Sequence, residues 1–175
     1  MRGSTHALAG AASASIFLYF NIPHNYPLLA LSAIAGFAAL LPDLDGREST
    51  IENIRVFGVR IMKAPGYVID RLFKHRGFLH SLMGLGLLAF ILLGFLPALP
   101  KEIVIAILLG CLSHLLTDGI TPAGVPWLYP LDWSPPLFSK YFAITTGSFM
   151  ETVFFIGLVV FYLIFLSQAG YVSFF

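Results

Sequence analysis

The sequence predicts an all-α integral membrane protein, a bundle of about five transmembrane helices with one amphipathic helix at the interface. Hydrophobic residues make up 58% of the 175 residues, and charged residues make up only 11%. A soluble domain carries about 25% charged residues, so too few charges remain here to cover a surface that faces water. The length suits one domain over residues 1–175.

Five apolar segments supply the predicted helices. They run over about 7–20, 26–41, 78–96, 103–120 and 149–166. A spanning helix needs roughly 20 apolar residues, and the last three segments meet that requirement. The first two are shorter, so flanking residues would have to complete a span, and a pair of buried or re-entrant helices is the alternative. Their alanine, glycine and serine content favours close packing between helices.

The connections between these segments differ in character. Residues 42–77 and 121–148 are long and hold most of the charge. From Ile51 to Lys63, apolar and basic residues interleave. That pattern predicts an amphipathic helix that lies in the membrane interface. The second long connection holds both tryptophans, Trp127 and Trp133, which are typical of an interfacial aromatic belt.

The distribution of basic residues predicts the orientation in the membrane. If all five segments span, the N-terminus and both long connections lie on one face, and only Lys101 among the basic residues lies on the other. The positive-inside rule makes the basic face cytoplasmic, in a multi-pass protein of the inner or plasma membrane. The net charge of +1 predicts no nucleic-acid partner. The oligomeric state cannot be deduced from these patterns.

Histidine and acidic residues gather at the segment ends on the predicted cytoplasmic side. The set comprises His6, Asp43, Asp45, His75, His80, His114, Asp118 and Glu151. His114 and Asp118 are four residues apart and therefore share one helix face. Ionisable groups beside lipid are costly unless they are paired or bind a cation. We therefore interpret this set as a candidate metal centre.

The ligand types indicate which chemistry such a centre could perform. Imidazole and carboxylate suit zinc, manganese or iron better than calcium, and zinc is the first choice. So many ligands could hold one to three ions, and paired ions commonly hydrolyse phosphoesters or amides by activating water. A spare carboxylate, Asp45 or Glu151, would serve as general base. Arg76 could clamp a phosphate oxygen.

Some of these residues also fit simpler interpretations. Glu151 could be a solvated acid favoured at a helix start. Arg76 could extend to lipid headgroups. Two other classes of function also remain open. A metal or ion transporter would need polar residues through the helix centres, which offer almost none, and a non-catalytic protein would use a closed metal site only for stability.

An ordered set of short motifs resembles a known family. The motifs are Thr5-His6 with Gly10, Leu41–Asp45, His75–Ser81, Ser113–Asp118 and Thr121–Pro126. Together they resemble the YdjM-like family of inner-membrane, metal-dependent hydrolases, some of which are under LexA control. The order of histidines and aspartates is also similar, more remotely, to zinc-dependent phospholipase C and nuclease enzymes.

The resemblance covers nearly the whole chain and has specific implications. It implies that His6, Asp43, Asp45, His75, His80, His114 and Asp118 bind metal. The substrate would be a small-molecule or lipid phosphoester, attacked by a metal-activated water at the cytoplasmic membrane surface, with membrane lipid as a partner. Two departures from the family pattern are Gly46-Arg47, where the family often has His-Pro, and Leu79, where it usually has Thr.

Overall fold

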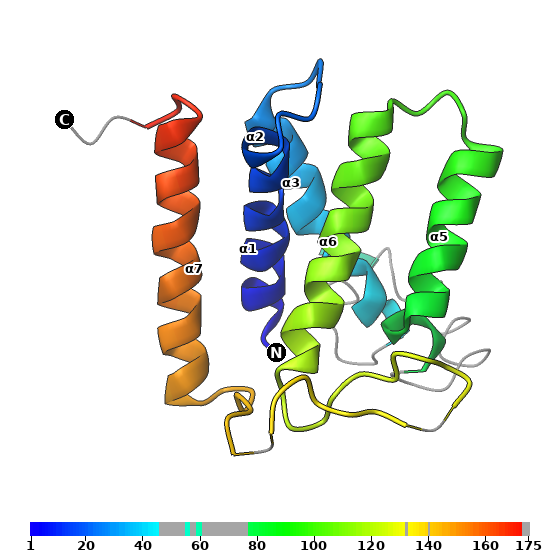
Figure 1. Cartoon of the computed structure of the whole chain (residues 1–175), viewed down its shortest axis with the longest axis vertical. Coiled ribbons are helices and arrows are strands. Elements are labelled where there is room, and N and C mark those ends of the chain that lie inside the picture. The colour runs from blue at the N-terminus through cyan, green and yellow to red at the C-terminus, as the bar shows by residue number, and fades with distance from the viewer. Residues whose placement is uncertain (46–54, 57–58, 61–76, 132, 140, 173–175) are drawn as a thin grey trace.

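The computed structural model describes residues 1–45, 55–56, 59–60, 77–131, 133–139 and 141–172. Its helices lie side by side, with successive long segments running in opposite directions (Figure 1). In chain order the α-helices are α1 (Gly3–Ser13), α2 (Ser15–Tyr19), α3 (Leu28–Ala38), α5 (Leu82–Phe95), α6 (Lys101–Gly119) and α7 (Phe149–Gln168). Each of the five predicted apolar segments therefore contains helix, and the predicted all-helical bundle is confirmed for these segments.

Shorter elements flank the helices at the lower end of the molecule in Figure 1. Two 3-10 helices, η1 (Leu41–Asp45) and η2 (Phe78–His80), follow α3 and precede α5 respectively. Ser81 then caps α5, because its hydroxyl accepts a hydrogen bond from the Gly84 amide. Both 3-10 helices carry candidate metal ligands.

One sequence prediction is wrong in part. Within the predicted interfacial helix, β1 (Arg55–Val56) pairs antiparallel with β2 (Val59–Arg60), so these four residues are not helical. The sequence contains the physical reason. Val56 and Val59 are β-branched, and glycine, which stands at position 58, disfavours helix. The rest of the predicted helix lies outside the described residues.

Glycines allow α1 and α6 to approach α3 closely. A Cβ atom at Gly10 of α1 would lie 2.5 Å from the backbone oxygen of Ala35 in α3. One at Gly110 of α6 would also collide with that oxygen, and would lie 2.9 Å from the Cβ atom of Ala38. This is the small-residue packing expected for helices in a membrane. The helices that carry His6, His114 and Asp118, α1 and α6, are thereby held at short distances from α3, which leads into η1 and Asp43.

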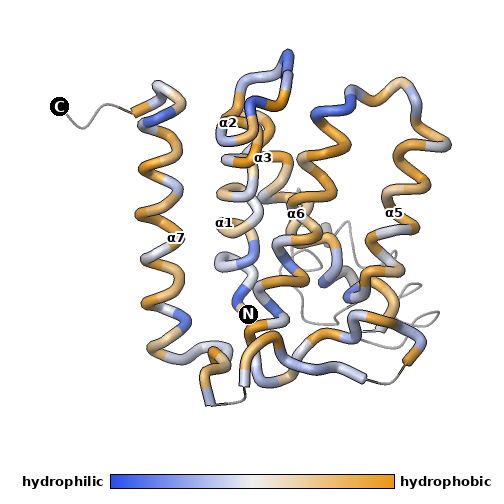
Figure 2. The backbone as a smooth tube through the Cα atoms, in the orientation of Figure 1, coloured by the Kyte–Doolittle hydropathy of each residue, from blue (hydrophilic) through white to orange (hydrophobic). Residues whose placement is uncertain are grey.

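Among the described residues, two helices are long and apolar enough to cross a membrane, α6 and α7. The apolar helix α5 and the apolar stretch that contains α3 are shorter. Half of the residues in the apolar stretch of α6 are buried in the bundle, whereas only 11% of the residues in the apolar stretch of α7 are buried. Hydrophobic residues follow most of the length of the helices, as Figure 2 shows. The outer faces of α5 and α7 therefore suit contact with lipid, and a span by all five segments stays a prediction.

Candidate metal centre

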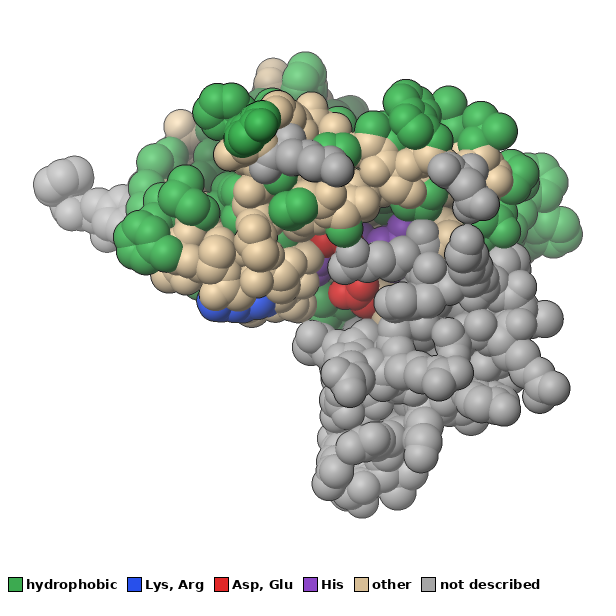
Figure 3. Space-filling model, turned by 90° about the horizontal axis from the view of Figure 1, so that it is seen from below, with side chains coloured by type: hydrophobic (Ala, Val, Ile, Leu, Met, Phe, Trp, Pro, Cys, Tyr) green, Lys and Arg blue, Asp and Glu red, His purple; other side chains and the backbone are tan. Residues whose placement is uncertain are grey.

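Five of the predicted ligands come together at the lower end of the bundle. They come from α1 (His6), η1 (Asp43), η2 (His80) and α6 (His114 and Asp118). Seen from below, acidic and histidine side chains lie close together on this face (Figure 3). They form two groups, His6 with His114 and Asp118, and Asp43 with His80 and His114. Within each group the potential ligand atoms all lie within 4.8 Å of one another.

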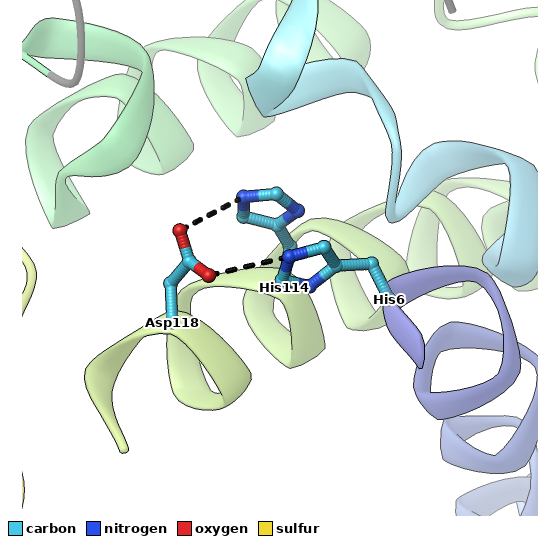
Figure 4. A group of neighbouring side chains, drawn as sticks. All are labelled: His6, His114 and Asp118. Carbon is cyan, nitrogen blue, oxygen red and sulfur yellow. Dashed lines mark ion pairs between the residues drawn. The ribbon is translucent and has the colours of Figure 1, made fainter. Parts of the chain in front are cut away.

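The first group joins α1 to α6. His6 Nε2 lies 3.2 Å from Asp118 Oδ1, and His114 Nε2 lies 3.8 Å from Asp118 Oδ2. Figure 4 shows both imidazoles facing the same carboxylate. The two rings stack with their centroids 3.9 Å apart. The amino group of Met1 also lies 2.5 Å from Asp118 Oδ1. The two oxygens of Asp118 are thus directed to different imidazoles.

The second group joins η1 and η2 to α6. Asp43 Oδ1 lies 3.4 Å from His80 Nε2 and 3.7 Å from His114 Nε2. The two Nε2 atoms are themselves 3.2 Å apart. Asp43 lies beyond the end of α3, where burial raises the pKa of its carboxyl group. The hydrogen bond with His80 and the adjacent imidazoles outweigh burial and leave that pKa below its usual value.

His6 and His114 are each oriented by a hydrogen bond at Nδ1, the ring nitrogen that does not face the other members of the centre. The Nδ1–H group of His114 donates to the backbone oxygen of Ala39 at 2.7 Å. The Thr117 hydroxyl donates to a backbone oxygen of its own helix, so it accepts from His6 Nδ1–H at 2.7 Å. Each histidine therefore has an Nε2 lone pair free of hydrogen, which in His6 faces Asp118 and in His114 faces His80 Nε2 and, farther away, both carboxylates. Metal-bound histidines are commonly held by such a second hydrogen bond.

The centre is buried, apart from one side. The side chains of His6, His80, His114 and Asp118 are at most 2% exposed, whereas Asp43 is 26% exposed. The Met1 ammonium group already pairs with Asp118. The Asp43 carboxylate and the imidazole lone pairs nearby have no such cation among the described residues, and they repel one another unless a cation lies between them. Their donor atoms are those that bind zinc, manganese or iron. The residues present thus fit a transition-metal ion, and Asp43 is the member of the set that is partly exposed.

Glu151, predicted as a candidate base, occupies a different network. Its Oε1 accepts hydrogen bonds from the Arg2 amide at 2.6 Å and the Thr5 hydroxyl at 3.0 Å. Its Oε2 accepts from the Gly147 amide at 2.6 Å and lies 3.6 Å from Arg2 Nε. The buried carboxylate thus ties the start of α7 to the start of α1. This network positions the helix that carries His6.

We expect Glu151→Gln to loosen this attachment without removing metal. The amide NH2 of glutamine would face one of the two backbone N–H donors, and a charged hydrogen bond would be lost. The midpoint of thermal unfolding should fall by about 5 °C or more. The number of metal ions bound at saturation should not change. A matched control is Tyr19→Phe, which removes an exposed hydrogen bond to Gln168 between α2 and α7. A wild-type midpoint for Glu151→Gln would contradict the role in positioning.

Three predicted site residues cannot be placed. His75, Arg76 and the side chain of Asp45 lie outside the described residues. Sequence reasoning also missed the partners that orient the imidazoles, Thr117 and the Ala39 oxygen. Thr117 could have been found, because it lies three residues after His114 and on nearly the same helix face. No sequence signal identifies a backbone oxygen on another helix as a hydrogen-bond partner.

Known proteins resemble this chain over most of its length. A family model described as YdjM inner membrane protein matches residues 1–173. The uncharacterized protein YvsG of Bacillus subtilis is 30% identical over 160 residues, which are 90% of this chain and 89% of YvsG. The inner membrane protein YdjM of Escherichia coli is 41% identical over 97 residues, 54% of this chain and 46% of that protein, and the Shigella flexneri protein matches equally. No solved structure matches the chain.

Proposed function

Because the chain belongs to the YdjM family of inner membrane proteins, we propose that it is a metal-dependent hydrolase that cleaves a phosphoester at the cytoplasmic membrane surface. The observation that carries the proposal is the convergence of three imidazoles and two carboxylates from four separate elements. Elements so far apart in the chain gain little by bringing such groups together beside lipid unless a cation binds them.

We propose that this centre would hold two metal ions. A single imidazole nitrogen coordinates one ion, so His114, which belongs to both groups, would bind only one of them. Asp118 in the first group and Asp43 in the second would each supply a carboxylate. Zinc is the first choice for these ligands, with manganese or iron as alternatives.

The exposed side of the centre favours catalysis over a closed structural site. A divalent cation, when bound, makes water more acidic and polarises a phosphoryl oxygen. Asp43 borders this side, where a phosphoester could approach. Asp45 follows in the same 3-10 helix and is the proposed general base, and Arg76 is proposed to bind phosphate. Glu151 is assigned to positioning α1, because its oxygens already accept several hydrogen bonds.

The test of this function is hydrolysis of phosphoesters by the purified protein. The panel contains a soluble phosphomonoester, a soluble phosphodiester and lipid phosphoesters in mixed micelles, each with zinc, manganese or iron. We expect the wild type to hydrolyse at least one substrate, and Asp118→Asn to lower the rate by about 100-fold or more, since a carboxylate ligand is lost. The control is His24→Ala, because His24 is exposed in the connection between α2 and α3.

The outcomes separate the proposed hydrolase from a structural metal site. Wild-type protein that binds metal but hydrolyses none of these phosphoesters would contradict the proposed activity. Asp118→Asn with undiminished hydrolysis would show that the reaction does not use this centre. Equal losses in Asp118→Asn and His24→Ala would point to general damage to the fold and would likewise count against the assignment.

A further inference from the structure

An apolar cavity of about 210 Å³ adjoins the metal centre. Its lining includes Pro42, Leu79 and Leu115, each next in the chain to a candidate ligand, namely Asp43, His80 and His114. The remaining lining residues, from α5, α6 and η1, are also apolar. Such a cavity can hold a hydrocarbon group close to the metal centre, but it offers a polar occupant almost no hydrogen bonds.

A second apolar cavity lies between α5 and α6. Its volume is about 400 Å³, and it shares Leu85 with the first cavity. On α6 the lining of the two cavities extends from Leu115 to Ile105. The ten steps between these two residues cover roughly 15 Å at 1.5 Å per residue. A bilayer has a hydrocarbon core of about 30 Å, so the two cavities together reach about as deep as one leaflet.

We propose that the two cavities hold an acyl chain of a glycerophospholipid whose phosphate group reaches the metal centre. This inference rests on the proposed phosphoesterase function and narrows its substrate to lipid. The depth of one leaflet, the apolar lining and the ligands at the inner end all match a chain attached to a phosphate headgroup.

A substitution at Gly86 would narrow the second cavity, the one between α5 and α6. This glycine lines that cavity, and a Cβ atom at this position would meet no atom within 4 Å. Gly86→Leu should therefore leave α5 folded, while the leucine side chain takes up part of the space that the acyl chain would occupy. Gly94 lies on the same helix and also has open space, but it lines neither cavity. Gly94→Leu is thus the matched control.

The test is photo-crosslinking in micelles of a maltoside detergent, which carries no phosphate, and it requires no hydrolysis. The probe is phosphatidylglycerol with a diazirine in one acyl chain, added at rising mole fraction. Mass spectrometry compares the label on α5 and α6 peptides with that on α7, which reports ordinary surrounding lipid. We expect saturable labelling of α5 and α6 in the wild type, lowered about fivefold or more in Gly86→Leu and unchanged in Gly94→Leu.

Two results would overturn the inference. One is labelling of α5 and α6 that never saturates and matches α7, which would mean surrounding lipid only. The other is equal labelling in Gly86→Leu and the wild type. The phosphoester panel reports separately on catalysis. Saturable labelling without hydrolysis would support the lipid site and contradict the proposed function. Hydrolysis without such labelling would support the proposed function and contradict the lipid site.

Discussion

Replacing His114 with alanine is expected to remove metal binding almost completely. His114 belongs to both ligand groups, and its Nε2 atom lies within 4 Å of His80 Nε2 and of oxygens of Asp43 and Asp118. Its Nδ1–H group is held by the Ala39 oxygen, so no other side chain can supply this lone pair in the same place. We expect metal affinity to fall by about 100-fold or more. This loss should exceed that caused by removing a residue that only hydrogen-bonds to a metal ligand.

Comparison with the other histidines makes this prediction specific. His6 and His80 each belong to one group only, so His6→Ala and His80→Ala should retain more metal than His114→Ala. His24→Ala should bind metal as the wild type does. Elemental analysis after dialysis measures bound metal, and thermal unfolding of the same samples separates loss of metal from loss of fold. Full stoichiometric metal in His114→Ala would remove the basis for the proposed centre.

Gly110→Leu is expected to prevent assembly of the bundle. A Cβ atom at Gly110 would already collide with the Ala35 backbone of α3, and backbone cannot move aside as a flexible side chain can. The helices α3 and α6 would have to separate, which also breaks the hydrogen bond from the Cys111 thiol to the Ala38 oxygen. Overpacking usually costs about 1–3 kcal/mol, and a whole leucine side chain against backbone should exceed that.

The measurement is the yield of monodisperse protein in detergent and its metal content. We expect little folded Gly110→Leu protein and no stoichiometric metal, because η1 and Asp43 follow directly from α3. Gly157→Leu is the matched control, since it adds the same side chain in α7 where a Cβ atom meets nothing within 4 Å. Wild-type yield and metal content in Gly110→Leu would show that the close contact between α3 and α6 is dispensable.

Much of the helical architecture and of the candidate ligand set could be predicted from the amino-acid sequence. Apolar length and composition identify five helical segments, because a chain beside lipid must satisfy its backbone hydrogen bonds within helices. The spacing of His114 and Asp118 places both on one face of α6. With alternating helix directions, the ends that carry His6, Asp43 and His80 fall at the same end of the bundle. These conclusions depend only on periodicity, length and chain direction.

Other features were decided only by the tertiary structure. Which imidazole faces which carboxylate depends on the rotation of each helix about its axis, and the contacts of Gly10 and Gly110 with α3 help set that rotation. The same packing makes His114 common to both groups, and it places Glu151 against Arg2 and Thr5. The pairing of Arg55–Val56 with Val59–Arg60 is a different case, because its β-branched residues are visible in the sequence but were outweighed by the amphipathic pattern around them. Interhelical distances join residues far apart in the chain, so no local pattern encodes them.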